Sequence, residues 1–177
     1  MILRHAGTWM VCVFTLAIFL ISCNGEKKDE KKVEKKVEQQ SKSVPDGYVD
    51  LGLPSGTLWK SENESGYYSF DEAVEKYGSS LPTKKQWKEL QDKCTWTWDE
   101  NRKGSEVKGP NGNSIFLKAL GYRGDSGVEI ALGNAGYYWS STPKNSDFAW
   151  GFVFFSGGKN IADDYRRIGQ TVRLVHN

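Results

Sequence analysis

Two tryptophans followed directly by acidic and amide side chains are the residues of this sequence that best fit ligand recognition. Trp96 and Trp98 alternate with threonines in a strand-like pattern, so both rings can lie on one face. Asp99, Glu100 and Asn101 follow at once. A flat ring to stack on, beside groups that bond hydroxyls, is what sugar recognition requires. Core packing is the preferred interpretation of the two rings, and binding is the alternative.

Acidic pairs elsewhere offer a second kind of chemistry. Asp163 and Asp164 are adjacent, Glu62 and Glu64 form a spaced pair, and all four are expected in loops. Two carboxylates can hydrolyse a glycosidic bond, and oxygen-rich loops can hold Ca²⁺. No EF-hand spacing is present. Whether these loops bind a metal ion stays an open question. Solvated loop charge is the preferred interpretation, and Asp163 and Asp164 are kept as candidate ligand contacts.

The side chains that most catalytic sites need are scarce. From residue 47 on, the chain has one histidine, His176, and one cysteine, Cys94. A Ser–His–Asp arrangement would have to use His176, which fits a solvated tail better. Cys94 fits a small buried side chain on a helix face. The sequence therefore predicts no catalytic residue and no cofactor.

The N-terminus predicts a lipid anchor. An apolar run over residues 9–21 has 13 residues, fewer than the ~20 that span a bilayer, and fits a signal peptide better. Residues 20–23, Leu-Ile-Ser-Cys, resemble the lipobox of bacterial lipoproteins. That resemblance implies a signal peptide over residues 1–22 and acylation (palmitate) of Cys23 at the new N-terminus. An uncleaved anchor helix is the alternative.

The residue after the anchor bears on the destination of the protein. Asn24 stands where many inner-membrane lipoproteins carry an aspartate. We therefore expect the outer membrane, with the cell surface favoured over the periplasmic face. Residues 23–45 follow as a tether rich in Lys, Glu, Gln and Ser, for which disorder is the default. A weak helix with Val33 and Val37 on one face is the competing interpretation.

Residues 46–177 have the length of a single domain with a real core. From residue 47 on there are 16 basic and 16 acidic residues, and no basic cluster stands out. Nucleic-acid binding needs such a cluster, so it is not expected. Six of the seven tryptophans and all eight tyrosines lie in this part, which indicates an aromatic core with some rings left for binding.

Two capping boxes predict two helices. Ser69 with Glu72 opens the first, which Gly78 should end, and Thr83 with Gln86 opens the second. After Cys94 the pattern changes to short apolar runs separated by Gly, Asn and Ser, which is typical of strands. Residues 148–155 read as a buried central strand, with Trp150 in the core. Helices early and antiparallel strands late predict an α+β fold.

Several motifs together resemble one known module. They are YVDLGLPSGTLW at residues 48–59, LPT at 81–83, GPNGNSIFL at 109–117, YWSST at 138–142 and QTVRLV at 170–175. In this order they are similar to the Fibrobacter succinogenes major paralogous domain, and the LPT helix start resembles the C-type lectin-like fold of the formylglycine-generating enzyme group. The resemblance implies two helices, a twisted antiparallel sheet, long loops, and pairing of residues 49–51 with residues 172–175.

The chain departs from these relatives at their functional residues. The formylglycine-generating enzymes need active-site cysteines, and only Cys94 is available here. The disulfides and calcium signatures of animal C-type lectins are absent from the sequence. We therefore expect an envelope-anchored, non-catalytic binding module for glycan or protein ligands. The alternatives are a structural or assembly subunit of a surface complex and a carboxylate-based glycan hydrolase.

Overall fold

The computed structural model describes residues 43–177, and the chain after Gln40 forms a compact unit of its own. The predicted signal peptide (1–22), the lipid attachment site Cys23 and nearly all of the tether (23–45) lie outside the described residues. Among residues 43–177, neither helix has the length and apolar character needed to cross a membrane. The domain is described here by itself.

Both predicted helices are present and begin where the capping boxes place them. Helix α1 spans Phe70–Tyr77 after the N-cap Ser69, and α2 spans Lys84–Lys93 after the N-cap Thr83. In each case the N-cap side chain accepts the N3 backbone N–H, and the N3 side chain bonds back to the N-cap backbone. Gly78, at a φ of 48°, ends α1 as predicted. A short 3₁₀ turn, Gly78–Ser80, links α1 to the extended chain before α2.

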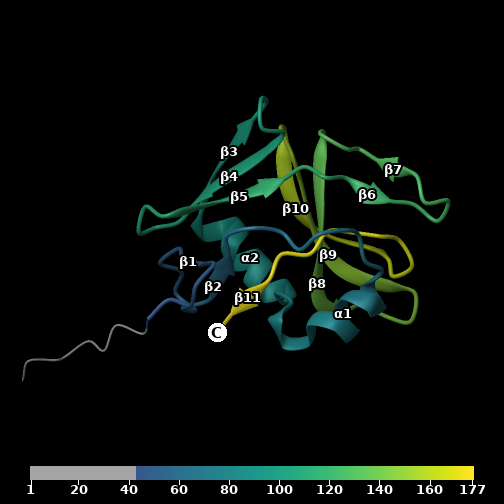
Figure 1. Cartoon of the computed structure of the whole chain (residues 1–177), viewed down its shortest axis with the longest axis horizontal. Coiled ribbons are helices and arrows are strands. Elements are labelled where there is room, and N and C mark those ends of the chain that lie inside the picture. Colours follow the sequence, from purple (N-terminus) through teal and green to yellow (C-terminus); the bar gives the residue numbers. More distant parts are fainter. Residues whose placement is uncertain (1–42) are drawn as a thin grey trace, which may run out of the picture. The chain divides into compact units, whose positions relative to one another are not determined.

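The strands form small antiparallel sheets rather than one large sheet (Figure 1). The first has the order β1 (Tyr48–Asp50), β2 (Leu58–Lys60), β11 (Val175–His176). The second has the order β3 (Thr95–Asp99), β4 (Gly104–Lys108), β5 (Ser114–Lys118). The third has the order β10 (Gly158–Tyr165), β9 (Phe148–Phe155), β8 (Ala135–Pro143). A hairpin of β6 (Tyr122–Arg123) and β7 (Glu129–Ile130) completes the set, so the α+β prediction is confirmed.

Three expectations about strands need correction. The terminal strands β1 and β11 do not pair with each other, because β2 lies between them and pairs with both. Asp163 and Asp164 belong to strand β10 and not to a loop. Among residues 43–177, the expected single sheet is divided into three three-stranded sheets and one two-stranded sheet, because strands pair mainly with their neighbours in sequence.

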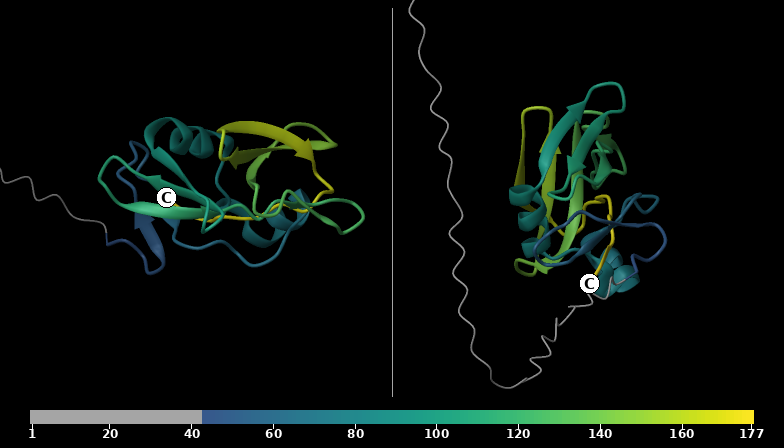
Figure 2. Two further views of the ribbon diagram at one scale, coloured as in Figure 1. Left: turned by 90° about the horizontal axis from the view of Figure 1, so that it is seen from above. Right: turned by 90° about the vertical axis from the view of Figure 1, so that its left-hand side faces the viewer.

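Aromatic side chains build the centre of the domain. Trp87 of α2 stacks on Phe152 of β9 at a centroid distance of 4.9 Å and an interplanar angle of 3°, and Trp59 of β2 lies 4.7 Å from Trp87. All three are essentially inaccessible to solvent. Because each large ring buries on the order of 150–250 Å², this stack fixes α2 against the β8–β9–β10 sheet. Figure 2 shows α2 running beside β10, on one face of that sheet.

A bulge in β8 positions the start of α2. The register with β9 shifts between Trp139 and Pro143. Within the bulge, the Ser141 N–H donates to the Pro82 carbonyl (2.9 Å), and the Thr142 hydroxyl accepts the Lys84 N–H (3.0 Å). These two bonds tie the start of α2 to strand β8. Trp150 of β9 is only partly buried, so its prediction as a core residue was wrong.

Candidate functional site

Trp96 and Trp98 lie on β3 and pack against the core. The Trp96 ring lies 5.2 Å from Phe152 and 5.7 Å from Phe154, and its Nε1 donates to the Leu90 carbonyl at 3.2 Å. Trp98 lies 6.4 Å from Phe154. One side of the pair borders a pocket of about 210 Å³ that the β9–β10 turn closes. Both rings thus serve packing first, with a small accessible face.

The polar residues after Trp98 shape the β3–β4 turn instead of facing that pocket. The Asp99 carboxylate accepts the backbone N–H of Asn101 and Arg102, both at 2.9 Å. Glu100 pairs with Lys103 at 3.1 Å, which is the main reason that its pKa is lowered. Neither these acids nor Asn101 lines the tryptophan pocket. The sequence neighbourhood of aromatic and acidic groups therefore does not become one site.

Asp163 and Asp164 point to opposite faces of β10, because neighbouring residues of a strand alternate. Asp163 pairs with Lys144 at 2.9 Å. Asp164 accepts bonds from the Tyr165 N–H (2.9 Å) and the Gln170 amide (3.3 Å), and burial raises its pKa. A glycosidic bond must lie between two carboxylates that face it. These two do not face a common space.

A wide, open cavity of about 920 Å³ lies at another edge of the domain. Four segments far apart in the sequence form it: the start of α1, the β6–β7 hairpin, the β8–β9 turn and the chain after β10. Its charged lining comes from three arginines, three aspartates and one glutamate, and we call it the arginine cavity. These residues are Asp71, Glu72, Arg123, Asp125, Asp147, Arg166 and Arg167.

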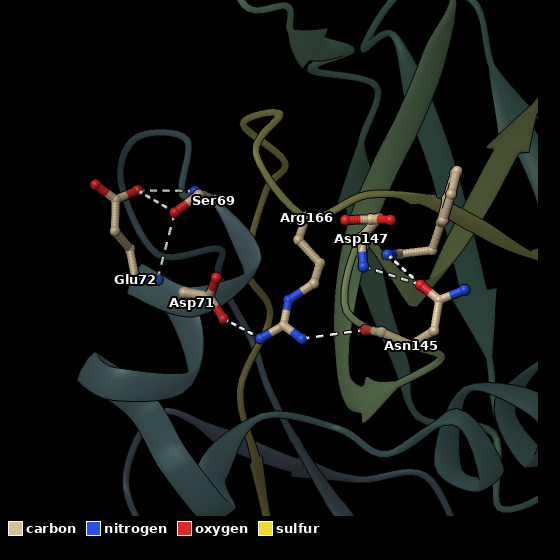
Figure 3. A network of polar contacts seen from close by, with 7 residues as sticks. Ser69, Asp71, Glu72, Asn145, Asp147 and Arg166 are labelled. Carbon is tan, nitrogen blue, oxygen red and sulfur yellow. Dashed lines mark hydrogen bonds and ion pairs between the residues drawn. The ribbon is translucent and has the colours of Figure 1, made fainter.

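Arg166 connects two of the segments that form this cavity (Figure 3). Its guanidinium forms an ion pair with Asp71 of α1 and donates to the Asn145 carbonyl of the β8–β9 turn at 3.2 Å. The same guanidinium lies 4.8 Å from the Phe70 ring. The Asn145 side chain in turn accepts the Asp147 N–H at 2.9 Å. Arg166 therefore ties helix and turn together through its two terminal nitrogens, while its buried Nε has no hydrogen-bond partner among residues 43–177.

Arg123 and Arg167 are the arginines that a ligand can reach. Their side chains are 47% and 59% exposed. The Arg167 Nε donates to Asp125 at 2.8 Å, which is the main cause of its raised pKa, and its guanidinium lies 4.1 Å from the Tyr165 ring. The Arg123 guanidinium lies 4.8 Å from the Tyr67 ring. Arg123 also pairs with Glu129 at 3.3 Å. A ring and a carboxylate therefore orient each guanidinium, and each keeps further N–H donors that can face a ligand.

Acceptors complete the arginine cavity. The Asp147 carboxylate has neither a hydrogen-bond donor nor an ion-pair partner among residues 43–177. Glu72 is different, since the Ser69 N–H and hydroxyl both donate to it at 2.8 Å and lower its pKa. Glu72 is therefore committed to capping α1. The cavity offers a ligand exposed guanidinium donors beside an uncommitted carboxylate.

The chemistry of this lining suits binding. Neither histidine nor cysteine lines the cavity. Cys94 lies at the end of α2, where burial raises its pKa to about 11, and His176 lies at the C-terminus, 5.8 Å from the Tyr48 ring. Within residues 43–177, no group of three or more His, Cys, Asp and Glu side chains is arranged to hold a metal ion. Planar polar groups on an open surface can hold hydroxyl-rich or charged ligands.

Sequence reasoning missed the arginine cavity. Arg123 and Arg167 are far apart in the chain, and each taken alone reads as a solvated surface charge. The signals that were present are the adjacent pair Arg166–Arg167 and the glycine-flanked turn at residues 124–127. Neither signal shows that the β6–β7 hairpin and the chain after β10 meet, which the bridge between Arg123 and Gly169 establishes.

Comparison with known proteins gives one finding. A family model described as a domain of unknown function (DUF8237) matches residues 83–175, which is about half of the chain and runs from the N-cap of α2 to β11. No curated protein and no solved structure matches the chain significantly. The matched span includes Arg123, Arg166 and Arg167 but not the start of α1.

Proposed function

We propose that this chain, which belongs to the family described as a domain of unknown function (DUF8237), is a non-catalytic binding module for glycan or protein ligands on a bacterial cell envelope. In this proposal Cys23 carries the lipid that anchors the protein in the outer membrane, with the ligand-binding domain facing the cell surface. The lipobox-like residues 20–23 support the anchor.

The arginine cavity is the observation that carries the binding proposal. Its volume of about 920 Å³ lies in the range of ligand sites, ~300–1,000 Å³. Arg123 and Arg167 present donors in a fixed planar geometry, and Asp147 presents free acceptors. Sugar hydroxyls need both kinds of partner. Asp125, which holds Arg167, keeps the donor oriented before a ligand arrives, and that reduces the entropy lost on binding.

A glycan and mucin array tests the proposal. The protein would be residues 43–177, which contain both hydrophobic clusters of the compact unit. We expect saturable binding that Arg167→Ala and Arg123→Ala each weaken about tenfold, the effect of one lost charge-assisted hydrogen bond. Arg102→Ala is the matched control, because Arg102 is an exposed arginine on the β3–β4 turn. Calcium and chelator arms show whether a metal takes part.

Two results would redirect the proposal. Binding that is lost in Trp96→Ala but unchanged in Arg167→Ala would move the site to the tryptophan pocket. Absence of binding to every glycan and mucin would leave only protein ligands. The anchor is tested separately: palmitate labelling in cells should disappear in Cys23→Ser, and labelling that persists would refute it.

The finer fold assignment is also part of this proposal. We infer a C-type lectin-like domain of the kind found in the Fibrobacter succinogenes major paralogous family. The motifs at residues 48–59, 81–83 and 138–142 support it, as do two helices and a terminal sheet that contains both chain ends of the domain. An experimental structure whose strand connections differ from that fold would refute the assignment.

One observation favours a second function, that of a structural or assembly subunit. Val128, Ile130 and Leu132 on the β6–β7 hairpin are 58%, 42% and 53% exposed. Alternate aliphatic residues on a projecting hairpin are typical of surfaces that contact a partner protein. Under this alternative, cross-linking in intact cells should trap a partner in stoichiometric amount, and Ile130→Asp should abolish the cross-link.

A further inference from the structure

We propose that a second surface, between the start of α2 and strands β9 and β10, binds acidic glycan chains, whose sugars carry carboxylate or sulfate groups. This surface is a groove of about 360 Å³ lined mainly by Lys84, Lys85, Lys88, Trp150 and Ile161, and we call it the lysine groove. The inference rests on the proposed function only for the glycan class of ligand. The site, its charge requirement and its test are separate from those of the arginine cavity.

Trp150 supplies the floor of the groove. It shares a face of β9 with Phe152 and Phe154, which α2 and β3 cover. Trp150 is only partly buried and lines the groove together with the lysines of α2. Ile161, paired with Phe152 across the β9–β10 ladder, extends the apolar floor. A flat ring beside an aliphatic surface matches the apolar face of a sugar ring.

The rim of the groove is positive. Lys144 and Lys88 have acidic partners, Asp163 at 2.9 Å and Asp92 respectively. Lys84 and Lys85 have no carboxylate partner among residues 43–177, so two positive charges at the groove remain uncompensated. The domain as a whole is balanced in charge, with 16 basic and 16 acidic residues from residue 47 on. The local excess therefore selects for a negatively charged ligand.

The position of these lysines on α2 is unfavourable for the stability of the fold. Lys84 and Lys85 are the first two residues of the helix, whose first turn contains no acidic residue. A helix N-terminus carries partial positive charge, so acidic side chains stabilise it and cations destabilise it. Helix α1 has the favourable arrangement, with Asp71 and Glu72 in its first turn. An anionic ligand would neutralise both the lysines and the helix terminus.

The polar groups around Trp150 suit a sugar more than a bare anion. The Lys84 Nζ lies 3.1 Å from the centroid of the Trp150 ring. Such a contact is weak at an exposed site. A sugar ring can therefore displace the ammonium, which then pairs with the acidic group of that sugar. Asn160 and Gln91 also border the groove and carry amides that bond hydroxyls.

Calorimetric titration of residues 43–177 with defined oligosaccharides tests the inference. The probes are a heparin tetrasaccharide, a tetragalacturonate and, as a neutral control, cellotetraose. We expect both acidic probes to bind, with affinity falling as salt rises, and cellotetraose not to bind in the groove. The double variant Lys84→Gln/Lys85→Gln should weaken binding about tenfold or more.

Matched variants keep the result specific. Lys93→Gln removes a lysine from the last turn of the same helix and should leave binding unchanged. Trp150→Ala should weaken binding of both acidic probes, whereas Trp150→Tyr, which keeps a ring, should retain most of it. Thermal unfolding of each variant verifies that the domain is folded. Arg167→Ala is measured beside the double variant: loss of acidic-probe binding in the double variant assigns the probes to the lysine groove, whereas loss in Arg167→Ala alone would assign them to the arginine cavity, so failure of this inference and failure at the arginine cavity are distinguishable.

Three outcomes would overturn the inference. The first is equal loss of affinity in Lys93→Gln and in the double variant, which would indicate general charge attraction. The second is cellotetraose binding, sensitive to Trp150→Ala, that matches the acidic probes. The third is binding to phosphatidylglycerol vesicles, lost in the double variant, without binding to either acidic oligosaccharide, which would assign the groove to an anionic lipid surface.

Discussion

Arg173 is a buried cation, and replacing it by methionine is expected to destabilise the domain. The side chain is inaccessible to solvent, and burial lowers its pKa. Its two terminal nitrogens donate to the Lys60 carbonyl at 2.7 Å and to the Phe116 carbonyl at 2.6 Å. Lys60 belongs to β2 and Phe116 to β5. Arg173 therefore links the terminal sheet to the β3–β4–β5 sheet.

The size of the effect follows from these two bonds. Hydrogen bonds to a charged group are worth ~1.5–3 kcal/mol each, and a buried carbonyl left without a donor costs ~1–3 kcal/mol. Methionine has similar length and no charge, so the variant also regains the desolvation penalty of the guanidinium. We expect a net loss of about 3 kcal/mol in the free energy of unfolding. For a domain of this size that corresponds to roughly 10 °C in Tm.

Urea denaturation and calorimetry of residues 43–177 measure this loss. Arg102→Met is the control, because Arg102 is exposed and stacks on Phe116 at 3.7 Å without bonding a buried carbonyl. Its effect should stay below about 1 kcal/mol. If Arg173→Met were no more destabilising than Arg102→Met, the two sheets would not depend on the buried guanidinium and the reasoning would be wrong.

Three other predictions follow from burial and close contacts. Burial raises the pKa of Asp164, so its ionisation destabilises the folded state as the pH rises through the folded-state pKa. Asp164→Asn should therefore raise the free energy of unfolding at pH 7. Urea titrations should show this gain vanishing toward pH ~4, near the pKa of an unfolded aspartate. Because the pKa of Cys94 is raised to about 11, its reaction with a disulfide reagent at pH 7.5 should be far slower in the native than in the unfolded protein, and equal rates would contradict this. A Cβ on Gly109 would lie 2.0 Å from the Leu51 carbonyl, so Gly109→Ala should cost ~2 kcal/mol or more by urea denaturation, unlike Gly124→Ala, where the nearest contact is 3.4 Å.

The helices could be predicted from sequence because their signals are local. Ser69 with Glu72 and Thr83 with Gln86 satisfy backbone groups three residues away, so four residues suffice to fix each helix start. The same locality explains the correct strand at Trp96 and Trp98, where alternation is visible within five residues. Where the contacts that decide an element lie within one helical turn or one strand, composition and spacing were enough to predict that element.

Burial and strand pairing depend on distant contacts and were harder to predict. Residues 148–155 do form a central strand, but the sequence of that strand does not reveal that Trp150 borders a groove lined by lysines, so Trp150 was placed in the core. Strand β10, with Asp163 and Asp164, is polar because it lies at the edge of its sheet, and polar alternation resembles a loop. In both cases the error concerned what packs against the strand.

The two proposed surfaces adjoin at the β8–β9 turn, which hydrogen bonds hold in place. The Lys144 Nζ pairs with Asp163 and lies 5.2 Å from the centroid of the Trp150 ring of the lysine groove, whereas Ser146 and Asp147 line the arginine cavity. Asn145, between them, accepts two backbone N–H groups within the turn. Linked sites of fixed geometry act on a single ligand at high effective concentration. A glycan chain long enough to cross the turn can therefore gain affinity from both surfaces.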